Sequence, residues 1–566
     1  MLSRLFTFVR LPAKQGFKKT SFFLTALCIT LFFILPLLAI ISQSWLADWQ
    51  NLWHLWQTVL PDYILNSLLL LFGTIALSLV FALPCAWIVS NYQFKGQRLL
   101  QWVLCLPLAM PAYLVGYLYT DLLDYPGPVQ SFLRDLFSWT SVQDYWFPSI
   151  RTLSGACFVL ALVLYPYIFL LVRIALLEQS ENLIHSAKIL GASPWQRIKK
   201  VVFPLTRPAI ATGAALVGME TLGDFGTVTY FAVPTLTTAV YDTWLGYGDL
   251  GSASQISFFM LTLIFILVIL ERYSRNKQKT YQRGYEKKSS FGTLSGYKLY
   301  LAQAYCWGLV GIAFFIPFAK LIYWAVHYFE NADLTGFFNY TYHSLSVSVI
   351  AAIICTFLAL FLNFAHRLTQ QNSVSYQKIT NLSLRLSTLG YAVPGTILAI
   401  GILIPYTAAD HLLNDLLKRL NLPAQGLIFS GTVFALVSAY VIRFSAVAIG
   451  SIETGFQKIP PSLDMASQTL GYNGLKMLRK IHFPLLTKGI LTALLMVFIE
   501  SMKELNASLL LRPFNFDTLA THVFTFTSDE QLENAALPAI TLVLVGLLPV
   551  ILLTRSLILN VEKERS

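Results

Sequence analysis

His185-Ser186-Ala187-Lys188-Ile189-Leu190-Gly191, with Val201-Val202-Phe203-Pro204 after it, is the stretch that decides how the chain is read. A related stretch recurs 280 positions later as Met465-Ala466-Ser467, Gly471 and Ile481-His482-Phe483-Pro484. The spacing from Gly to Pro is the same in both copies, and each copy lies between long apolar runs. A polar loop repeated in this way indicates one docking device in each of two homologous halves.

Composition indicates a membrane protein. Of 566 residues, 56% are hydrophobic and 12% are charged, and the mean hydropathy is +0.62. A soluble domain carries about 25% charged residues, and an apolar run of about 20 residues crosses a bilayer. We therefore expect an all-α polytopic fold with about twelve transmembrane helices, six in each half. The candidate spans are 21–43, 65–90, 99–121, 153–177, 207–224, 254–271, 301–327, 343–365, 386–407, 427–450, 487–504 and 537–560.

The distribution of basic residues predicts the orientation. The net charge is +12, and Lys and Arg gather before the first span and in residues 272–298, whereas 44–63 and 225–253 contain neither. Cytoplasmic loops are enriched in Lys and Arg, so we expect both termini in the cytoplasm. The net positive charge is therefore accounted for by the cytoplasmic loops of a protein in the lipid bilayer. We expect no nucleic-acid partner.

The chain divides into five segments on this reading. They are an N-terminal tail with the first transmembrane helix (1–62), a first repeat domain (63–271), a basic cytoplasmic linker with the seventh helix (272–341), a second repeat domain (342–556) and a cytoplasmic tail (557–566). Pro111 and Pro394 are expected to break the third span of each half. Three outer segments, 122–150, 225–253 and 505–536, are long enough to fold locally.

Each repeated loop is expected to form a finger of two short helices. Gly191 and Gly471 end the first helix, since glycine readily adopts the left-handed backbone found there. Pro204 and Pro484 then turn the chain back to the membrane. The expected helix caps are Ser180, Ser193, Ser462 and Asn473.

These loops resemble the signature loop of ABC importer permeases. Positions that match are Ala187, Gly191 and Pro204 in the first copy and Ala466, Gly471, Ile481 and Pro484 in the second. The family's leading Glu is replaced by His185 and Met465, its second Ala by Ser467, and its Leu by Phe203 and Phe483. The resemblance implies a type I importer membrane fold whose two loops couple to a cytoplasmic ATPase dimer.

Further stretches are similar to the bacterial ferric-iron ABC permeases. They are Tyr165-Pro166-Tyr167, Met219 to Thr227, Thr235 to Thr238, Met502 to Leu505 and Leu511 to Ala520. This resemblance implies a fused inner-membrane permease that works with a periplasmic ferric-iron-binding protein. The dipeptide Gly-Lys of a phosphate-binding loop never occurs in the chain. We therefore expect a non-catalytic subunit that binds no cofactor, with ATP used by the partner.

Four acidic residues lie in spans, where a charge costs roughly 2.5–3.5 kcal/mol on insertion scales. Glu220 and Asp224 are four residues apart, as are Glu500 and Glu504, and the two pairs are again 280 positions apart. Carboxylate oxygens are hard ligands that suit a hard cation such as ferric iron. We hypothesise that the four acids form a weak, transient metal site on the substrate pathway.

Two structural alternatives remain open for these acids. Glu504 could pair with Lys503 or Arg512, and Asp224 could cap the outer end of its helix. The sequence also leaves the substrate open. An importer of thiamine or a polyamine has the same architecture, and an ion-coupled secondary transporter also fits twelve spans with a two-fold repeat.

Overall fold

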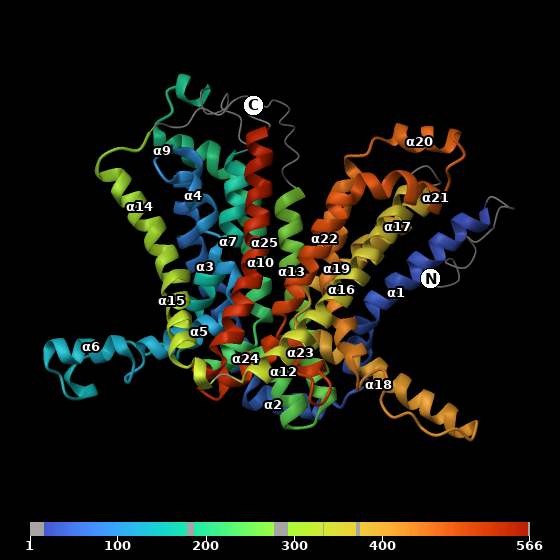
Figure 1. Ribbon diagram of the computed structural model, residues 1–566, viewed down its shortest axis with the longest axis horizontal. Helices are drawn as coiled ribbons and strands as arrows, with labels where there is room; N and C mark the ends of the chain where they lie inside the picture. Colours follow the sequence, from blue (N-terminus) through green and yellow to red (C-terminus); the bar gives the residue numbers. More distant parts are fainter. Residues whose placement is uncertain (1–15, 178–185, 277–292, 332, 370–373, 564–566) are drawn as a thin grey trace.

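The computed structural model describes residues 16–177, 186–276, 293–331, 333–369 and 374–563, and helices dominate those ranges (Figure 1). The helices of the first half are α1 (Gly16–Leu46), α2 (Trp49–Thr58), α3 (Leu60–Asn91), α4 (Gln97–Val103), η3 (Leu106–Ala109), α5 (Ala112–Leu123), α6 (Pro128–Phe137), η4 (Val142–Asp144), α7 (Leu153–Leu177), α9 (Pro194–Arg197), η5 (Ile198–Val202), α10 (Phe203–Gly223), α11 (Gly226–Tyr230), α12 (Leu236–Tyr241), η6 (Asp242–Gly246) and α13 (Leu250–Asn276).

The second half repeats this order. Its helices are α14 (Tyr297–Val310), η7 (Gly311–Phe315), α15 (Ile316–His327), η8 (Phe329–Asn331), α16 (Leu334–Thr369), α17 (Val374–Ser387), η9 (Leu389–Ala392), α18 (Gly395–Arg419), α19 (Val433–Gln457), α20 (Pro461–Thr469), α21 (Leu475–Met477), η10 (Leu478–His482), α22 (Phe483–Lys503), α23 (Asn506–Leu511), α24 (Leu519–Ser528), η11 (Leu532–Ala535) and α25 (Ala536–Lys563).

The membrane spans agree with the expected number. In the described residues, 11 helices are long and apolar enough to cross a bilayer, and a twelfth span is formed if Gln97–Ala109 and Ala112–Phe137 are taken together across a 91° bend. The predicted breaks at Pro111 and Pro394 are confirmed, because each proline directly precedes a new helix, α5 or α18. The residues before them, Met110 and Val393, are extended, as expected for a residue that precedes proline.

Two predicted spans were too short. The structure extends 207–224 to Trp195–Gly223 and 487–504 to Leu475–Lys503, 29 residues each. The expectation that Pro204 and Pro484 turn the chain was wrong, since both lie in the first turn of a helix, α10 or α22, that follows a π-helical turn. Each proline directly follows a π-helical turn within a continuous span, and such a local change of backbone hydrogen bonding lets a membrane helix accommodate proline.

The internal repeat is visible in hydrogen bonds as well as in helix order. The Ser67 hydroxyl on α3 accepts from the Leu236 N–H at 2.8 Å, and the Ser344 hydroxyl on α16 accepts from the Leu519 N–H at 2.7 Å. Both bonds tie the start of a spanning helix to the first residue of a short outer helix, α12 or α24. The outer segments 122–150, 225–253 and 505–536 do fold locally, as predicted, into α6 with η4, α11 with α12, and α23 with α24.

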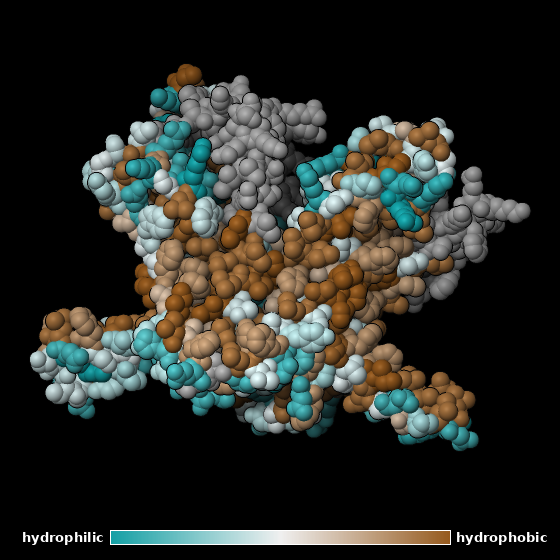
Figure 2. Space-filling model, viewed as in Figure 1, coloured by the Kyte–Doolittle hydropathy of each residue, from teal (hydrophilic) through white to brown (hydrophobic). Residues whose placement is uncertain are grey.

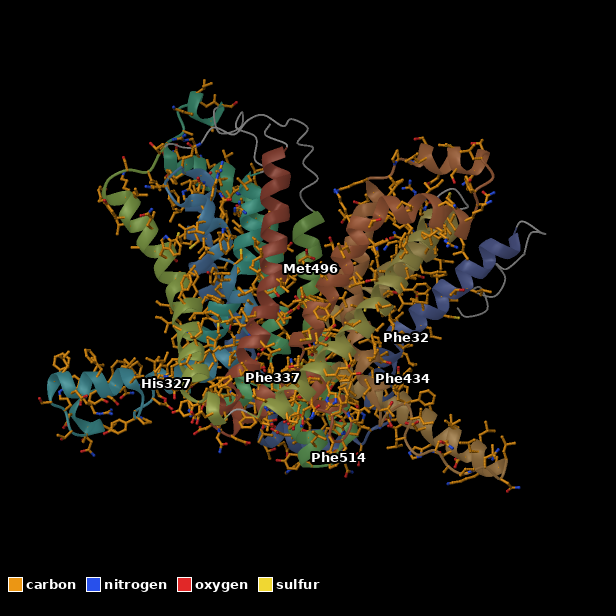
Figure 3. The ribbon with its side chains drawn as sticks, viewed as in Figure 1. Phe32, His327, Phe337, Phe434, Met496 and Phe514 are labelled. Carbon is orange, nitrogen blue, oxygen red and sulfur yellow. The ribbon has the colours of Figure 1, made fainter. Side chains whose placement is uncertain are left out.

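The two hydrophobic cores each contain residues from both halves of the sequence. One core joins α3, α5 and α7 to α15, α24 and α25, and the other joins α16, α18 and α19 to α1, α12 and α13. We call these packed units the first and second lobes. The first helix of each half therefore packs in the lobe built mainly by the other half. In Figure 3, Phe32 of α1 lies on the same side of the molecule as Phe434 of α19, while His327 of α15 lies toward α5 and α6.

The lobes stand side by side with two distinct ends. The fingers that carry α9 and α20 lie at one end, and α2, α6, α12 and α24 lie at the other (Figure 1). Between the ends, the surface is mostly hydrophobic, with hydrophilic residues gathered above and below (Figure 2). This is the pattern of a protein that lies across a bilayer.

Candidate functional site: a carboxylate cavity between the lobes and two fingers

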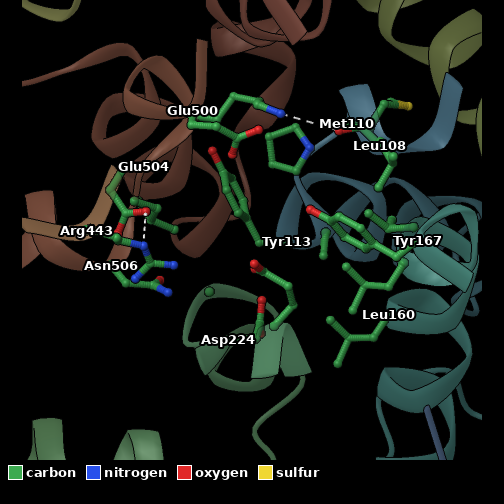
Figure 4. Close-up of a pocket in the computed structure, with 18 of the residues that line it drawn as sticks. Leu108, Met110, Tyr113, Leu160, Tyr167, Asp224, Arg443, Glu500, Glu504 and Asn506 are labelled. Carbon is green, nitrogen blue, oxygen red and sulfur yellow. Dashed lines mark hydrogen bonds and ion pairs between the residues drawn. The ribbon is translucent and has the colours of Figure 1, made fainter. Parts of the chain in front are cut away.

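All four membrane acids line one cavity of about 160 Å³ (Figure 4). Glu220 and Asp224 come from the end of α10, and Glu500 and Glu504 from the end of α22. The remaining wall is built from both halves of the chain, by Leu108, Met110, Pro111, Ala112, Tyr113, Leu160, Val163, Leu164, Tyr167, Gly226, Tyr391, Arg443, Phe444, Lys503, Leu505 and Asn506. Two pairs of carboxylates that are 280 residues apart in sequence thus meet at the junction of the repeats.

Asp224 and Glu504 hold the backbone where the spanning helices end. Asp224 Oδ1 accepts from the N–H groups of Thr227 and Val228 at 2.9 and 3.1 Å, and Oδ2 accepts from the Thr227 hydroxyl at 3.0 Å. Glu504 Oε1 accepts from the Ala507 N–H at 3.1 Å. These bonds satisfy N–H groups at the start of α11 and α23 that have no partner within their own helix. Asp224 is the C-cap residue of α10, in line with the capping alternative, and its side chain in addition caps the start of the next helix, α11.

Glu504 also pairs with a cation that the sequence reading did not single out. Arg443 Nε on α19 lies 3.3 Å from Glu504 Oε2, and the two side chains are 11% and 7% exposed. The two partners expected from sequence are engaged elsewhere: Arg512 pairs with Asp517, and Lys503 Nζ donates to the Leu108 carbonyl at 3.5 Å. A basic residue in the middle of the candidate span 427–450 was the available signal for Arg443.

Glu220 and Glu500 differ from the other two acids. Within the described residues, neither carboxylate has a hydrogen bond or an ion pair, although both line the cavity and both are partly exposed to it. Two acids therefore hold the walls and two face the space between the lobes.

Charge in the cavity is distributed unequally between the halves. The two cations, Arg443 and Lys503, both belong to the second half, and the positions 280 residues earlier are Val163 and Gly223. With every group ionised, four carboxylates and two cations leave an excess of negative charge. Across the described ranges, no group of three or more His, Cys, Asp or Glu side chains is close enough to hold a metal ion as a cage.

The walls at this junction are closely packed. The Asn506 side-chain amide on α23 donates to the Gly223 carbonyl on α10 at 2.7 Å, which joins the two halves directly. A Cβ atom added at Gly395, the first residue of α18, would lie 2.6 Å from Glu504 Oε1 and 2.9 Å from Arg443 Nη1. The break that Pro394 makes in the third span therefore lets backbone approach the ion pair.

The fingers have the backbone that the glycine pattern predicted. Gly191 and Gly471 adopt φ values of 80° and 79°. In each finger the N–H of the residue after this glycine bonds to a carbonyl five residues back, Ala192 to Ala187 and Tyr472 to Ser467, both at 3.0 Å. This is the Schellman arrangement that commonly ends a helix. The left-handed glycine therefore has the same structural role in both copies.

Of the predicted helix caps that lie in the described residues, only Ser193 is confirmed. In the first finger, Ser193 caps the helix that begins at Pro194, and its hydroxyl accepts from the Gln196 N–H at 3.3 Å. In the second, Ser462 lies inside α20, whose N-cap is Pro460, because the prolines at 460 and 461 already fix the start of the helix. The N-cap of α21 is Gly474 and not Asn473, because Gly474 adopts a positive φ of 55°. Ser180 and His185 lie outside the described residues.

The second finger is fixed to the membrane helices by a buried ionic cluster. Arg367 Nε at the end of α16 donates to Asp464 Oδ2 on α20 at 2.7 Å, and His482 Nε2 lies 2.8 Å from Asp464 Oδ1. Asp464 and His482 are 4% and 0% exposed. The equivalent positions of the first half are Ser90, Ile184 and Val202, so this cluster is particular to the second finger.

Both fingers present apolar side chains at the end of the molecule. Ile189, Leu190 and Trp195 are 85%, 85% and 70% exposed on the first, and Met465, Leu470 and Leu475 are 57%, 74% and 62% exposed on the second. Exposed apolar clusters of this kind mark protein interaction sites. Ala187 and Ala466 belong to the same fingers, and Pro204 and Pro484 follow them in the first turn of α10 and α22.

Comparisons with known proteins agree with the repeat. The family model described as "Binding-protein-dependent transport system inner membrane component" matches residues 78–279 and 373–514. The chain is 25% identical over 502 residues to the Fe(3+)-transport system permease protein FbpB 2 of Haemophilus influenzae, which covers 88% of this chain and 90% of that protein. It is 30% identical over 224 residues to the molybdenum transport system permease protein ModB of Escherichia coli, covering 38% of this chain and 92% of that protein.

A third relative is similar over one half. The sulfate transport system permease protein CysT of Escherichia coli is 29% identical over 214 residues, which covers 36% of this chain and 72% of that protein. The family matches, the spanning helices and the repeated fingers agree with one another: each indicates a membrane protein built from two copies of one domain. The chain belongs to the family of inner membrane components of binding-protein-dependent transport systems, as a multi-pass membrane protein that carries the family's domain twice.

Proposed function

We propose that this chain is the permease subunit of an ABC importer that carries ferric iron across the bacterial inner membrane. The proposal rests first on Glu220 and Glu500, two carboxylates that line a cavity between the lobes and have no hydrogen bond or ion pair within the described part of the chain. Carboxylate oxygen is a preferred ligand of hard cations. Similarity to the Fe(3+)-transport permease extends over most of both chains and supports the same substrate.

The site is suited to transit and not to storage. An ion that must leave needs binding that is favourable enough to enter and weak enough to release. Glu220 and Glu500 supply ligand oxygens, and Tyr167 and Tyr391 line the same cavity, whereas the Tyr113 hydroxyl donates to the Ala520 carbonyl at 3.4 Å. Asp224 and Glu504 hold the cavity walls through hydrogen bonds from backbone N–H groups. They therefore add negative charge to the cavity, but their oxygens are not free to act as ligands.

Charge favours a cation over the sulfate for which one of the relatives is named. Sulfate carries negative charge, and the excess of carboxylates in this cavity opposes its entry. Arg443 does not reverse this balance, because Glu504 lies against it.

The fingers are the proposed contact with a separate ATPase dimer that hydrolyses ATP. Their exposed apolar residues suit a protein partner, and the basic residues Arg197, Lys199, Arg479 and Lys480 support a cytoplasmic location for this end, because cytoplasmic loops are enriched in Lys and Arg. The opposite end then faces the periplasm, where an iron-binding protein delivers the substrate. Differential binding of nucleotide by the partner drives the lobes between their two openings.

Uptake of radiolabelled ferric iron by proteoliposomes tests the proposal. The vesicles contain this chain with its ATPase, and the assay is run with and without ATP and an iron-loaded binding protein. We expect uptake that requires both, and a large loss of uptake in the Glu220→Gln/Glu500→Gln variant with basal ATPase activity retained. The matched control is Glu453→Gln, an exposed acid of α19 outside the cavity.

Two outcomes contradict the proposal at different levels. ATP-driven uptake of molybdate, sulfate or thiamine in place of iron keeps the importer and rejects the substrate. Iron uptake that is unchanged in the double variant keeps the substrate and removes the two carboxylates from its path.

A further inference from the structure

Two helical arms extend sideways from the end of the molecule opposite the fingers. The first arm is α6 with its return segment, residues 124–150, and the second is the end of α18 with its return segment, residues 406–432. In Figure 1 they leave opposite edges of the molecule, α6 from the first lobe and α18 from the second. Neither arm is used by the cavity or the fingers.

The arms are copies of one amphipathic pattern. Their apolar positions are 280 residues apart throughout, and so are the polar positions between them. The apolar residues are Val129, Phe132, Leu133, Leu136 and Phe137 in the first arm and Ala409, Leu412, Leu413, Leu416 and Leu417 in the second. A helix with this spacing has one apolar face and one polar face.

The first arm is held rigid by its polar face. The buried side chain of Gln130 donates to the Leu123 carbonyl at 2.7 Å and accepts from the Tyr145 hydroxyl at 2.5 Å. Arg134 donates to the Tyr125 carbonyl at 2.8 Å and stacks over the Tyr125 ring at 4.1 Å. The polar side of α6 is therefore occupied by the residues just before the helix and, through Tyr145, by the arm's return segment.

The second arm uses the equivalent positions for the same purpose. Asp410, which corresponds to Gln130, is fully buried and accepts from the N–H groups of Ile428, Phe429 and Ser430 at 2.8–2.9 Å. Asn414, which corresponds to Arg134, donates to the Gly426 carbonyl at 2.7 Å. In both arms the polar side chains of the helix thus bond to neighbouring residues of the same chain, and the apolar side chains remain exposed on the other face.

The exposed stripes are large, and the stripe of the first arm faces the transmembrane surface. Phe132 and Leu136 are 64% and 61% exposed, and Leu412 and Leu416 are 72% and 54% exposed. In Figure 2 the side of the first arm nearest the apolar band is hydrophobic and its far side is hydrophilic, and hydrophobic atoms also run along much of the second arm. A partner that arrives from the aqueous side would meet the hydrophilic side instead.

We propose that the two arms lie in the boundary between headgroups and acyl chains of the leaflet opposite the fingers. A rigid helix with an apolar face and a polar face binds a membrane in this way, parallel to its plane. The apolar stripes continue the transmembrane surface of each lobe, so the same lipid covers both. Each arm braces the outer end of its own lobe against the bilayer while the lobes move relative to one another.

Spin-label accessibility in the full chain tests this placement. A nitroxide is attached to Leu136→Cys or Leu416→Cys, in a background where Cys28, the exposed native cysteine among the described residues, is replaced by Ala. Asp135→Cys and Asp415→Cys are matched controls, because each is exposed and is the preceding residue of the same helix. Power saturation is measured with oxygen, which concentrates in lipid, and with a water-soluble nickel chelate, in nanodiscs of phosphatidylethanolamine and phosphatidylglycerol.

We expect oxygen to relax the labels at 136 and 416 severalfold more than the nickel chelate does, and the reverse at 135 and 415. Equal access of the nickel chelate to all four positions would overturn the proposal. So would labels at 136 and 416 that become protected only when an iron-loaded binding protein is added, since the stripes would then be a protein docking face. Phe132→Cys and Leu412→Cys repeat the test on the same stripes if either first variant fails to fold.

Discussion

The pairing of Glu504 with Arg443 gives the sharpest prediction. Glu504→Gln leaves the Arg443 guanidinium without its closest counter-charge in a site where both side chains are about nine-tenths buried. Removing one partner of a buried ion pair costs about 3–5 kcal/mol. We expect the lower end of this range, about 3 kcal/mol, because Glu220 and Glu500 line the same cavity and Gln still accepts from Ala507.

The assay is thermal unfolding of the purified chain in detergent. One kcal/mol moves the midpoint by about 2–4 °C in domains of 150–250 residues, and by less in a longer chain. We therefore expect Glu504→Gln to lower the midpoint by roughly 3–6 °C. Glu500→Gln removes a carboxylate that has no hydrogen bond or ion pair to any described residue, so its midpoint is expected to stay near that of the wild type.

A double-mutant cycle separates this explanation from simple loss of packing. Arg443→Met alone is expected to destabilise the chain, because it leaves Glu504 buried without its cation. Arg443→Met combined with Glu504→Gln is expected to cost clearly less than the sum of the single changes. Strict additivity, or a Glu504→Gln variant as stable as Glu500→Gln, refutes the reasoning.

Three other predictions concern the fingers and His522 of α24. Asp464→Asn breaks the buried ion pair with Arg367 and is expected to lower the unfolding midpoint. It is also expected to weaken the stimulation of the partner ATPase by substrate. Equal stimulation in the wild type and the variant would speak against a role of Asp464 in coupling. Gly471→Ala places a side chain at φ 79° and is expected to cost about 1 kcal/mol, whereas Gly450→Ala, in a helix with open space around its Cβ, is neutral or stabilising in the same melt. Burial lowers the pKa of His522, outside the spans, from 6.5 to about 4. The unfolded chain then binds a proton there at a higher pH than the folded chain, so the stability from neutral His522 is full above pH 6.5 and is lost as the pH falls toward 4. Melts at pH 7.5 and 5 are expected to differ less in His522→Phe than in the wild type; an equal difference excludes His522 as the cause.

Much of the fold could be predicted from the sequence, because the length of an apolar run and the position of a proline determine structure at that point of the chain. The number of spans, the breaks at Pro111 and Pro394 and the left-handed turns at Gly191 and Gly471 all depend on a few consecutive residues. Errors arose where a signal was ambiguous. Pro204 and Pro484 suit either a turn or the first turn of a helix, and the structure uses the helix.

The candidate site was only partly predictable, because its roles depend on contacts distant in sequence. Glu220, Asp224, Glu500 and Glu504 were recognisable as costly charges in spans, and they do line one cavity. Their division into two capping acids and two acids without partners depends on Arg443 and on the start of α11 and α23, which only the packed structure places. The second arm was missed altogether, since its helix continues a membrane span without a turn signal.

The exchange of first helices between the lobes has a consequence for how the two halves assemble. A half expressed alone lacks a helix of its own main core and exposes the surface that its first helix would have covered in the other lobe. We expect such a fragment to be removed by the cell's proteases, and two co-expressed fragments to rescue each other even with the covalent connection between them cut. The connection then sets the ratio of the halves at one to one, and the crossed helices keep them together.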